Sequence, residues 1–192
     1  MVRYEKGHKD ETRRHILDVA SAQFHESGIA AVGLAGIMSE AGLTNGAFYT
    51  HFESKEDLVR EVLLDALSRR EERHKDNLEN GVELVTTIRE YLSPHHRDSA
   101  GTGCPTAALV AEVARHPKTT RDAFTGKISD IIALMAAQIR QGSSGERRRK
   151  AIAIYATMVG ALQLSRAVND RQLSEEILED AVEAAVNLAR GR

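Results

Sequence analysis

The segment Leu34–Lys55, LAGIMSEAGLTNGAFYTHFESK, decides the fold predicted for this chain. Apolar residues at helical spacing in its first part predict a short helix with one face to bury: Leu34, Ile37, Met38 and Ala41. Gly42 can adopt the positive φ that ends such a helix, and Thr44 offers a hydroxyl N-cap for a second one. Two helices joined by so tight a turn are typical of a helix-turn-helix.

The second helix of this segment divides its side chains between two faces. Phe48 and Phe52 lie four residues apart and share one face, whereas Asn45, Tyr49 and Thr50 point elsewhere. So short a helix is unstable alone, and its neighbours must hold it through the phenyl rings. Its polar face is then free, and in a helix-turn-helix this face enters the major groove of DNA.

Around this segment the sequence predicts an all-α protein of about nine helices. A helix over 11–27 ends at Gly28 and follows residues 1–10, which we interpret as a solvated arm. A long helix begins behind Ser54, in a near capping box, and runs to about Lys75. Its later part, SRREERHKD, is charged on all sides, which indicates a solvated surface.

The rest of the chain predicts a helical bundle. Pro105 and Pro117 are placed to open two helices, the polar stretch 93–103 is expected to be a loop, and GSSG at 142–145 a flexible break. Helices are expected at 81–92, 106–115, 118–140, 146–168 and 174–189.

Composition excludes several classes of protein. The chain has 192 residues, 42% hydrophobic and 28% charged, and no stretch approaches the roughly 18 apolar residues of a membrane span. Residues 1–15 lack the apolar core of a signal peptide, and a single cysteine excludes an internal disulfide, which fits the cytoplasm. No G-x-S-x-G, C-x-x-C or H-E-x-x-H motif occurs, so we expect no enzyme activity, no catalytic residues, no metal and no cofactor.

Overall charge does not itself indicate nucleic acid. The net charge is −2 and the pI about 6.5, whereas a DNA-binding domain is often above about 9. The first sixty residues hold seven Lys and Arg against nine Asp and Glu. DNA binding would therefore depend on the local placement of a few cations.

Residues 12–63 resemble the TetR/AcrR family of bacterial transcription regulators. The matching stretches are ILDVASAQFHESGI and IMSEAGLTNGAFYTHFESKEDLV, which contain AGLT-x-G-x-FY-x-HF-x-SKE. GCP at 103–105 is similar to a motif of some members. The resemblance implies a homodimer, with a helix-turn-helix DNA-binding domain over 1–54 and a helical ligand-binding and dimerisation domain over 55–192.

The same resemblance assigns DNA contacts to the end of the quoted segment. Base-reading positions fall on Asn45, Gly46 and Tyr49, and phosphate-facing ones on Ala47, Thr50, His51 and Lys55, behind the opening Thr44. An Asn suits a bidentate contact with adenine, and a Tyr ring packs on a thymine methyl. The hydroxyl and basic residues common before the turn are replaced by Val32 or Gly33 and by Ala35, and Asn45 stands where Lys is frequent, so salt dependence should be mild.

The last two predicted helices are apolar on more than one face. One face suits the chain's own core, and the other suits the same helix pair of a second chain, in a four-helix bundle. A larger monomer core is the alternative. The expected dimer residues are Tyr155, Val159, Leu162, Leu178, Ala181, Val182, Ala185 and Val186.

An effector pocket is expected between the helices from residue 105 onward. Candidates by residue type are Cys104, Phe124, Met135, Tyr155, Met158 and Gln163. Cys104 directly precedes Pro105, so it should lie at a helix N-terminus, where amide dipoles favour a reactive thiolate. It is either a sensor of oxidants or electrophiles, with His95, His96 and His116 close in sequence, or a small buried residue.

Three functions follow from these features. The first is a ligand-responsive repressor whose dimer reads double-stranded operator half-sites about 34–36 Å apart and is released by a small-molecule effector. The second is a regulator that senses thiol chemistry through Cys104. The third is a helical protein-interaction module that does not bind DNA. None of the three needs a membrane.

Overall fold

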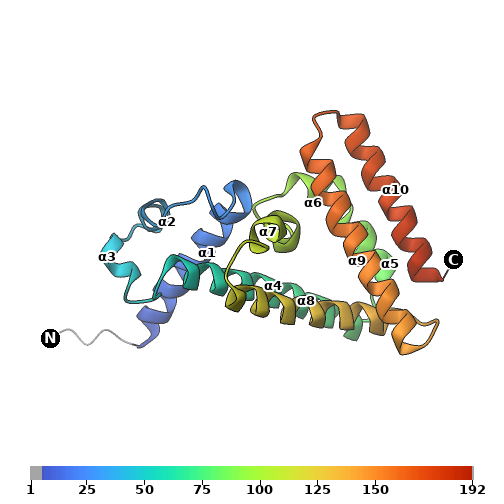
Figure 1. The fold of residues 1–192 in the computed structure, drawn as a ribbon, viewed down its shortest axis with the longest axis horizontal. Helices are drawn as coiled ribbons and strands as arrows, with labels where there is room; N and C mark the ends of the chain where they lie inside the picture. The colour runs from blue at the N-terminus through green and yellow to red at the C-terminus, as the bar shows by residue number, and fades with distance from the viewer. Residues whose placement is uncertain (1–5, 192) are drawn as a thin grey trace.

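The computed structural model describes residues 6–191, and over these residues the chain forms ten helices and no strand. They are α1 (Lys6–Ser27), α2 (Leu34–Glu40), α3 (Asn45–Phe48), α4 (Lys55–Glu79), α5 (Leu84–Tyr91), α6 (Pro94–Asp98), α7 (Pro105–Val113), α8 (Lys118–Gln138), α9 (Ser144–Ala167) and α10 (Arg171–Arg190). Figure 1 shows α1, α2 and α3 at one end of the molecule and the α9–α10 pair at the other, with α4 and α8 packed side by side between them. The predicted all-α class is confirmed.

Several helix boundaries lie where local chemistry predicts them. Gly28 ends α1 with φ +81°, and its N–H donates to the carbonyl of Phe24 at 2.9 Å. The Ser54 hydroxyl caps α4 by accepting from the N–H of Asp57 at 3.1 Å. Pro105 occupies the first turn of α7, where its missing N–H leaves no bond unmade.

Several boundaries differ from the predictions. α3 ends at Phe48, so Tyr49 and Phe52 follow the helix, while α5 begins at Leu84 and α10 at Arg171. α1 begins at Lys6, so residues 6–10 are helical, while the expectation for residues 1–5 lies outside the described residues. The predicted loop 93–103 contains α6, because the Ser93 hydroxyl accepts from the N–H of His96 at 3.2 Å and starts a helix. The predicted break at 142–145 contains the first residues of α9, because Ser143 forms a capping box with Glu146.

The described residues form two hydrophobic cores, and α4 contributes side chains to both. The first joins α1, α2, α3 and the start of α4, includes Phe24 and Phe48, and takes Leu109 from α7. The second joins the rest of α4 to α5, α7, α8, α9 and α10. Leu63 belongs to the first core and Leu67 to the second, so α4 is a rigid connection between them.

The charged end of α4 is mostly solvated, as predicted, but it has one buried side. Glu71 and His74 are buried there, because α8 lies alongside α4. Lys127 of α8 donates to the Glu71 carboxylate at 2.9 Å, and the hydrogen bonds from Lys75 and Lys127 lower the pKa of Glu71. A charge pattern that looks symmetrical in sequence therefore has one buried side.

No helix within the described residues combines the length and the apolar character needed to cross a bilayer. The same residues contain no group of three or more His, Cys, Asp or Glu side chains arranged to hold a metal ion.

Candidate functional site

The turn between α2 and α3 has the geometry of a helix-turn-helix. Gly42 ends α2 with φ +68°, which strains any residue with a side chain, and its N–H donates to Ser39 at 3.1 Å. The N–H of Leu43 then donates to the carbonyl of Met38 at 2.8 Å, the closing bond of a Schellman turn. α3 follows after Thr44, whose backbone is extended.

α3 is a single turn of helix held from behind by two rings. Phe48 is 1% exposed and Phe52 2%, and the rings stack with centroids 5.5 Å apart. The Arg13 guanidinium of α1 covers the Phe52 ring at 4.9 Å from its centroid. On the other side Tyr49 is 68% exposed, and Asn45 is exposed as well. The helix thus presents a polar face that the packing does not use.

The predicted DNA-contact residues in and around α3 differ in their exposure to solvent. Thr44, Asn45 and Gly46 are exposed, but the predicted hydroxyl cap is wrong, because the Thr44 side chain makes no capping hydrogen bond. Ala47 is half-buried and packs against the first core. The Thr50 hydroxyl donates to the carbonyl of Ala47 at 2.7 Å, so its oxygen can still accept.

The two basic residues predicted to contact phosphates, Lys55 and His51, already interact with other parts of the protein. The Lys55 ammonium donates to the carbonyl of Ile29 at 2.8 Å and so fixes the segment after α1. The His51 ring is half-buried, and burial, followed by the charges of Lys9 and Arg13, lowers its pKa. His51 is therefore neutral at pH 7 in the free protein.

Lys9 and Arg13 are cations that the sequence interpretation did not place at this surface. Residues 1–10 were taken as an arm, whereas Lys9 lies on α1, one turn before Arg13, and both charges reach His51. Arg13 also pairs with Glu61 of α4 at 3.1 Å. Their i, i+4 spacing could have indicated this, because a helix that begins at Lys6 places both side chains on the same face.

Two carboxylates tie the first core to the helical body. Glu112 of α7 accepts from the N–H of Ile29 at 3.1 Å and of Ala30 at 2.8 Å. Gly28 precedes these two residues with φ +81°, a conformation that favours glycine, and a Cβ there would lie 2.6 Å from Glu112 Oε1 and displace the carboxylate. The second carboxylate is that of Glu56, at the start of α4, which accepts from His116 and Thr120 where α7 leads into α8.

The second link centres on Glu56. Its carboxylate accepts from His116 Nδ1 at 2.9 Å and from the buried Thr120 hydroxyl at 2.6 Å. His116 is therefore held beside α4 and is not a neighbour of Cys104, as its place in the sequence had allowed. With Glu112, these bonds make α7 and its following turn the polar connection between body and helix-turn-helix.

Cys104 occupies the N-cap position of α7 and is 1% exposed. The buried Tyr91 and Tyr155 rings lie beside it, and burial raises the pKa of both hydroxyls, with Cys104 adding to the rise. The Tyr155 hydroxyl is 2.8 Å from that of Thr106. His96 packs edge-on against Tyr91 with centroids 4.7 Å apart. Of the three histidines near Cys104 in sequence, only His96 is placed against a neighbour of the thiol.

The other predicted ligand residues are also core residues. Met158 is 1% exposed and Met135 is fully buried, while Phe124 is half-buried and packs against both cores. Gln163 donates to the carbonyl of Ala107 at 3.0 Å. None of these side chains lines the cavity between α4, α5 and α6 that is described below.

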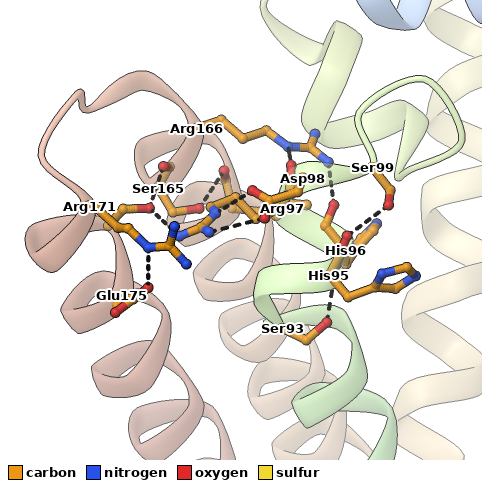
Figure 2. A network of polar contacts seen from close by, with 12 residues as sticks. Ser93, His95, His96, Arg97, Asp98, Ser99, Ser165, Arg166, Arg171 and Glu175 are labelled. Atoms are coloured by element: carbon orange, nitrogen blue, oxygen red, sulfur yellow. Dashed lines mark hydrogen bonds and ion pairs between the residues drawn. The ribbon is translucent and has the colours of Figure 1, made fainter.

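A polar network fixes α6, the helix absent from the sequence interpretation (Figure 2). Arg166 of α9 donates to the carbonyls of Arg97 at 3.0 Å and His96 at 2.8 Å. Arg97 donates to the Ser174 hydroxyl of α10 at 2.9 Å. These bonds join residues far apart in the sequence, so local patterns give no sign of them.

The last two helices leave one apolar face uncovered. The eight predicted dimer residues already pack in the chain's own second core: Tyr155, Val159, Leu162, Leu178, Ala181, Val182, Ala185 and Val186. The opposite face instead exposes Ile152 (44%) and Leu164 (58%) of α9 and Leu173 (44%) of α10. Ala156 lies between the first two at helical spacing and is exposed too. These are the large apolar side chains of α9 and α10 that the chain's own core leaves exposed.

Comparison with known proteins agrees with the helix-turn-helix geometry. Residues 16–62 match the family of bacterial regulatory proteins called the tetR family, and residues 82–181 match the tetracyclin repressor-like C-terminal domain. The transcriptional regulator AcrR of Shigella flexneri is 45% identical over 62 residues, which are 32% of this chain and 29% of AcrR. The chain thus spans less than a third of that relative's length.

Longer alignments extend over the body. The transcriptional repressor NemR of Escherichia coli K12 is 24% identical over 163 residues, 79% of this chain and 82% of NemR. The crystal structure of reduced E. coli NemR superposes with a TM-score of 0.79 at 23% identity, over 92% of this chain and 96% of that one. Bacillus subtilis FadR in complex with stearoyl-CoA gives 0.63 at 17% identity, over 88% and 97%. At these identities the structures show a shared fold.

Proposed function

The chain belongs to the TetR family of bacterial regulatory proteins, and we propose that it is a homodimeric repressor that releases its operator when a small molecule binds the helical body. One observation carries the proposal: Asn45 of α3 and its C-cap Tyr49 are exposed, while Phe48 and Phe52 hold this turn from behind. The relatives reported above are regulators rather than enzymes, and this function requires no bond to be made or broken.

In this proposal α3 lies in the major groove. Asn45 and Tyr49 contact base edges, and Gly46 lets the backbone approach them closely. Thr44, Ala47, Thr50, His51 and Lys55 face the phosphates, joined by Lys9 and Arg13 of α1. A phosphate beside His51 would favour its charged form, which the free protein disfavours.

A titration of a promoter fragment taken from beside the chain's own gene tests the proposal. We expect specific binding that weakens as salt rises, with a shallow slope because few cations lie near α3. An unrelated fragment of equal length is the control. Equal affinity for both fragments, or no binding at low salt by an intact dimer, would reject the repressor and favour a protein-interaction module.

The dimer in this proposal forms through the exposed face of α9 and α10. Leu164 and Leu173 lose water only if a second chain covers them, and Ile152 and Ala156 extend the same surface along α9. A two-fold axis through this face builds a four-helix bundle of two α9–α10 pairs.

Leu164→Glu is expected to raise the dimer dissociation constant at least tenfold, because each copy buries a charge in the interface. Sedimentation over a concentration series measures it, and circular dichroism checks that the monomer keeps its helices. Asp122→Asn, an exposed change on α8, is the control. A Leu164→Glu protein that stays as dimeric as the control would exclude this face.

Release of the operator in this proposal passes through α7. Glu112 fixes the segment after α1, and Glu56 fixes the start of α4, so a shift of α7 and its following turn moves both helices that frame α3. The effector acts by binding one spacing of the two recognition helices better than the other. The B. subtilis structure with stearoyl-CoA supports small-molecule binding in this fold.

Thiol sensing is a second candidate function, favoured by the position of Cys104 at the opposite end of α7 from Glu112. An adduct on the buried sulfur needs space that only a movement of α7 can supply. Cys104→Ser is expected to keep operator affinity within about twofold while losing release by N-ethylmaleimide. Equal release of the variant and the unmodified chain would end the sensor interpretation.

A further inference from the structure

A cavity of about 740 Å³ lies between the second half of α4, α5 and α6. Its volume suits a small organic ligand. Three arginines line it, Arg70 and Arg73 of α4 and Arg89 of α5, against a single carboxylate, Glu90. Arg89 also lines a second cavity, together with Glu175, Glu179 and Glu183 of α10. Among the described residues, none of the three arginines forms an ion pair.

Other arginines of α4 do form ion pairs. Arg69 points to the outer face, where it pairs with Asp18 at 2.7 Å and Asp65 at 2.8 Å. Arg70, one residue later, instead holds its guanidinium 5.6 Å from the centroid of the Tyr91 ring. Cations facing the cavity are thus left without counter-charges, while the one facing solvent is neutralised.

Histidines complete the lining, and two of them carry buried nitrogens without partners. His74 is 5% exposed, and its Nδ1 has no hydrogen-bond partner among the described residues. His96 Nδ1 lies 2.7 Å from the Tyr91 carbonyl, so it must donate, which leaves a buried Nε2 without a partner. Buried polar atoms are rarely left unpaired in native proteins, so their presence here indicates a missing partner.

Local electrostatics point to the sign of that partner. Burial, followed by the charges of Arg70 and Arg73, lowers the pKa of His74 to about 4. Burial and then Arg70, Arg166 and Arg73 lower the pKa of His96, against the opposing effect of the Tyr91 carbonyl. The cavity therefore has a positive field that only an anion relieves.

The wall of the cavity is also held in place. Arg166 and Ser174 fix α6 from the side of α9 and α10, and Figure 2 shows the His95 ring on the side of α6 away from Arg171 and Glu175. A fixed set of donors recognises a planar oxyanion better than mobile surface lysines do.

We propose that this cavity binds a small organic anion bearing at least two carboxylate or phosphate groups, and that this anion is the effector. Arg70 and Arg73 take one anionic group, and Arg89 takes the other from across the cavity. A neutral His74 with its hydrogen on Nδ1 donates to the oxygens of the anion. The bound anion also favours a protonated His96, whose Nε2–H then donates to it. The inference rests on the proposed function, because an effector acts only on a regulator.

Pyrophosphate and citrate are the two probes, which separate phosphate from carboxylate recognition. Calorimetry on the dimer, with sodium chloride matching the ionic strength, is expected to give dissociation constants below about 1 mM for at least one of them. Arg73→Gln and Arg89→Gln are expected to weaken that binding at least tenfold. Both side chains are exposed, so the variants should fold, as their circular dichroism will verify.

Arg121→Gln is the matched control, because it removes one exposed positive charge on α8 away from the cavity. It should change the dissociation constant less than twofold. If neither probe binds, or if the control weakens binding as much as Arg73→Gln, the anion site is excluded.

Operator titration of the same samples separates this inference from the proposed function. Release of the operator by the bound probe supports the effector role, and binding without release overturns it. A chain that binds its operator but neither anion retains the proposed function without this site. A chain that binds no operator has lost the proposed function and the effector role together, whatever the calorimetry shows.

Discussion

Phe48→Ala is expected to lower the free energy of unfolding by about 3–5 kcal/mol and to abolish operator binding. The ring is 1% exposed in the first core and stacks on Phe52, so its loss leaves a cavity under α3. A single turn of helix has no stability of its own, and it loses its place when this anchor is removed. Chemical denaturation measures the first effect, and fluorescence anisotropy on the promoter fragment measures the second.

Tyr49→Ala is the matched control on the next residue. Its ring lies edge-on to Phe48 at 5.2 Å but is 68% exposed, so we expect a change in unfolding free energy of less than about 1 kcal/mol. Operator affinity should still fall by about 1–3 kcal/mol if the ring contacts a base. Equal stability losses for both variants would mean that α3 is not anchored as described. Unchanged affinity for Tyr49→Ala would remove Tyr49 from the DNA contacts.

Local chemistry made much of the fold predictable. Gly28 and Gly42 each end a helix with positive φ, and Ser54 and Pro105 stand where helices begin. Each of these signals acts within four residues and needs no tertiary partner. The two-ring face of α3 was predictable for the same reason, since Phe48 and its partner are one turn apart.

Features that depend on distant partners were not predictable in this way. α6 was taken for a loop because its Pro94 start lies in a polar stretch, and what stabilises it is Arg166, about seventy residues later. The charged end of α4 shows the same limitation. Nothing in SRREERHKD tells that Arg69 faces solvent with two carboxylates while Arg70 faces a cavity.

Helices with apolar residues on two faces limited the sequence prediction in a third way. The apolar residues of α9 predicted two partners, but periodicity alone cannot say which face meets the chain's own core. Leu162 was assigned to a second chain and packs inside, whereas Leu164, two residues later, is 58% exposed. The Glu112 link was missed for a related reason, since a lone carboxylate on a short helix looks like solvated surface until its partners, 82 and 83 residues earlier, are known.

Acidification from pH 7.5 to pH 5 is expected to cost the folded state about 2 kcal/mol through His74 alone. Burial and then Arg70 and Arg73 lower the pKa of His74 from 6.5 to about 4, so the unfolded chain takes up a proton in this range and the folded chain does not. The stabilisation is complete above pH 6.5 and declines down to about pH 4. The lowered pKa values of His25 and His96 act in the same direction.

His74→Gln isolates this contribution, because glutamine does not titrate. Unfolding is measured at both pH values and one protein concentration, in buffers without polyvalent anions that could bind near Arg70. The comparison uses each protein's own difference between the two pH values, so a constant packing cost of the substitution cancels. The lowered pKa of Glu71 affects stability mainly below its usual value of 4.5, outside this range. If the variant loses as much stability as the unmodified chain, His74 takes up its proton equally in the folded and the unfolded chain, and the positive field inferred around it is absent.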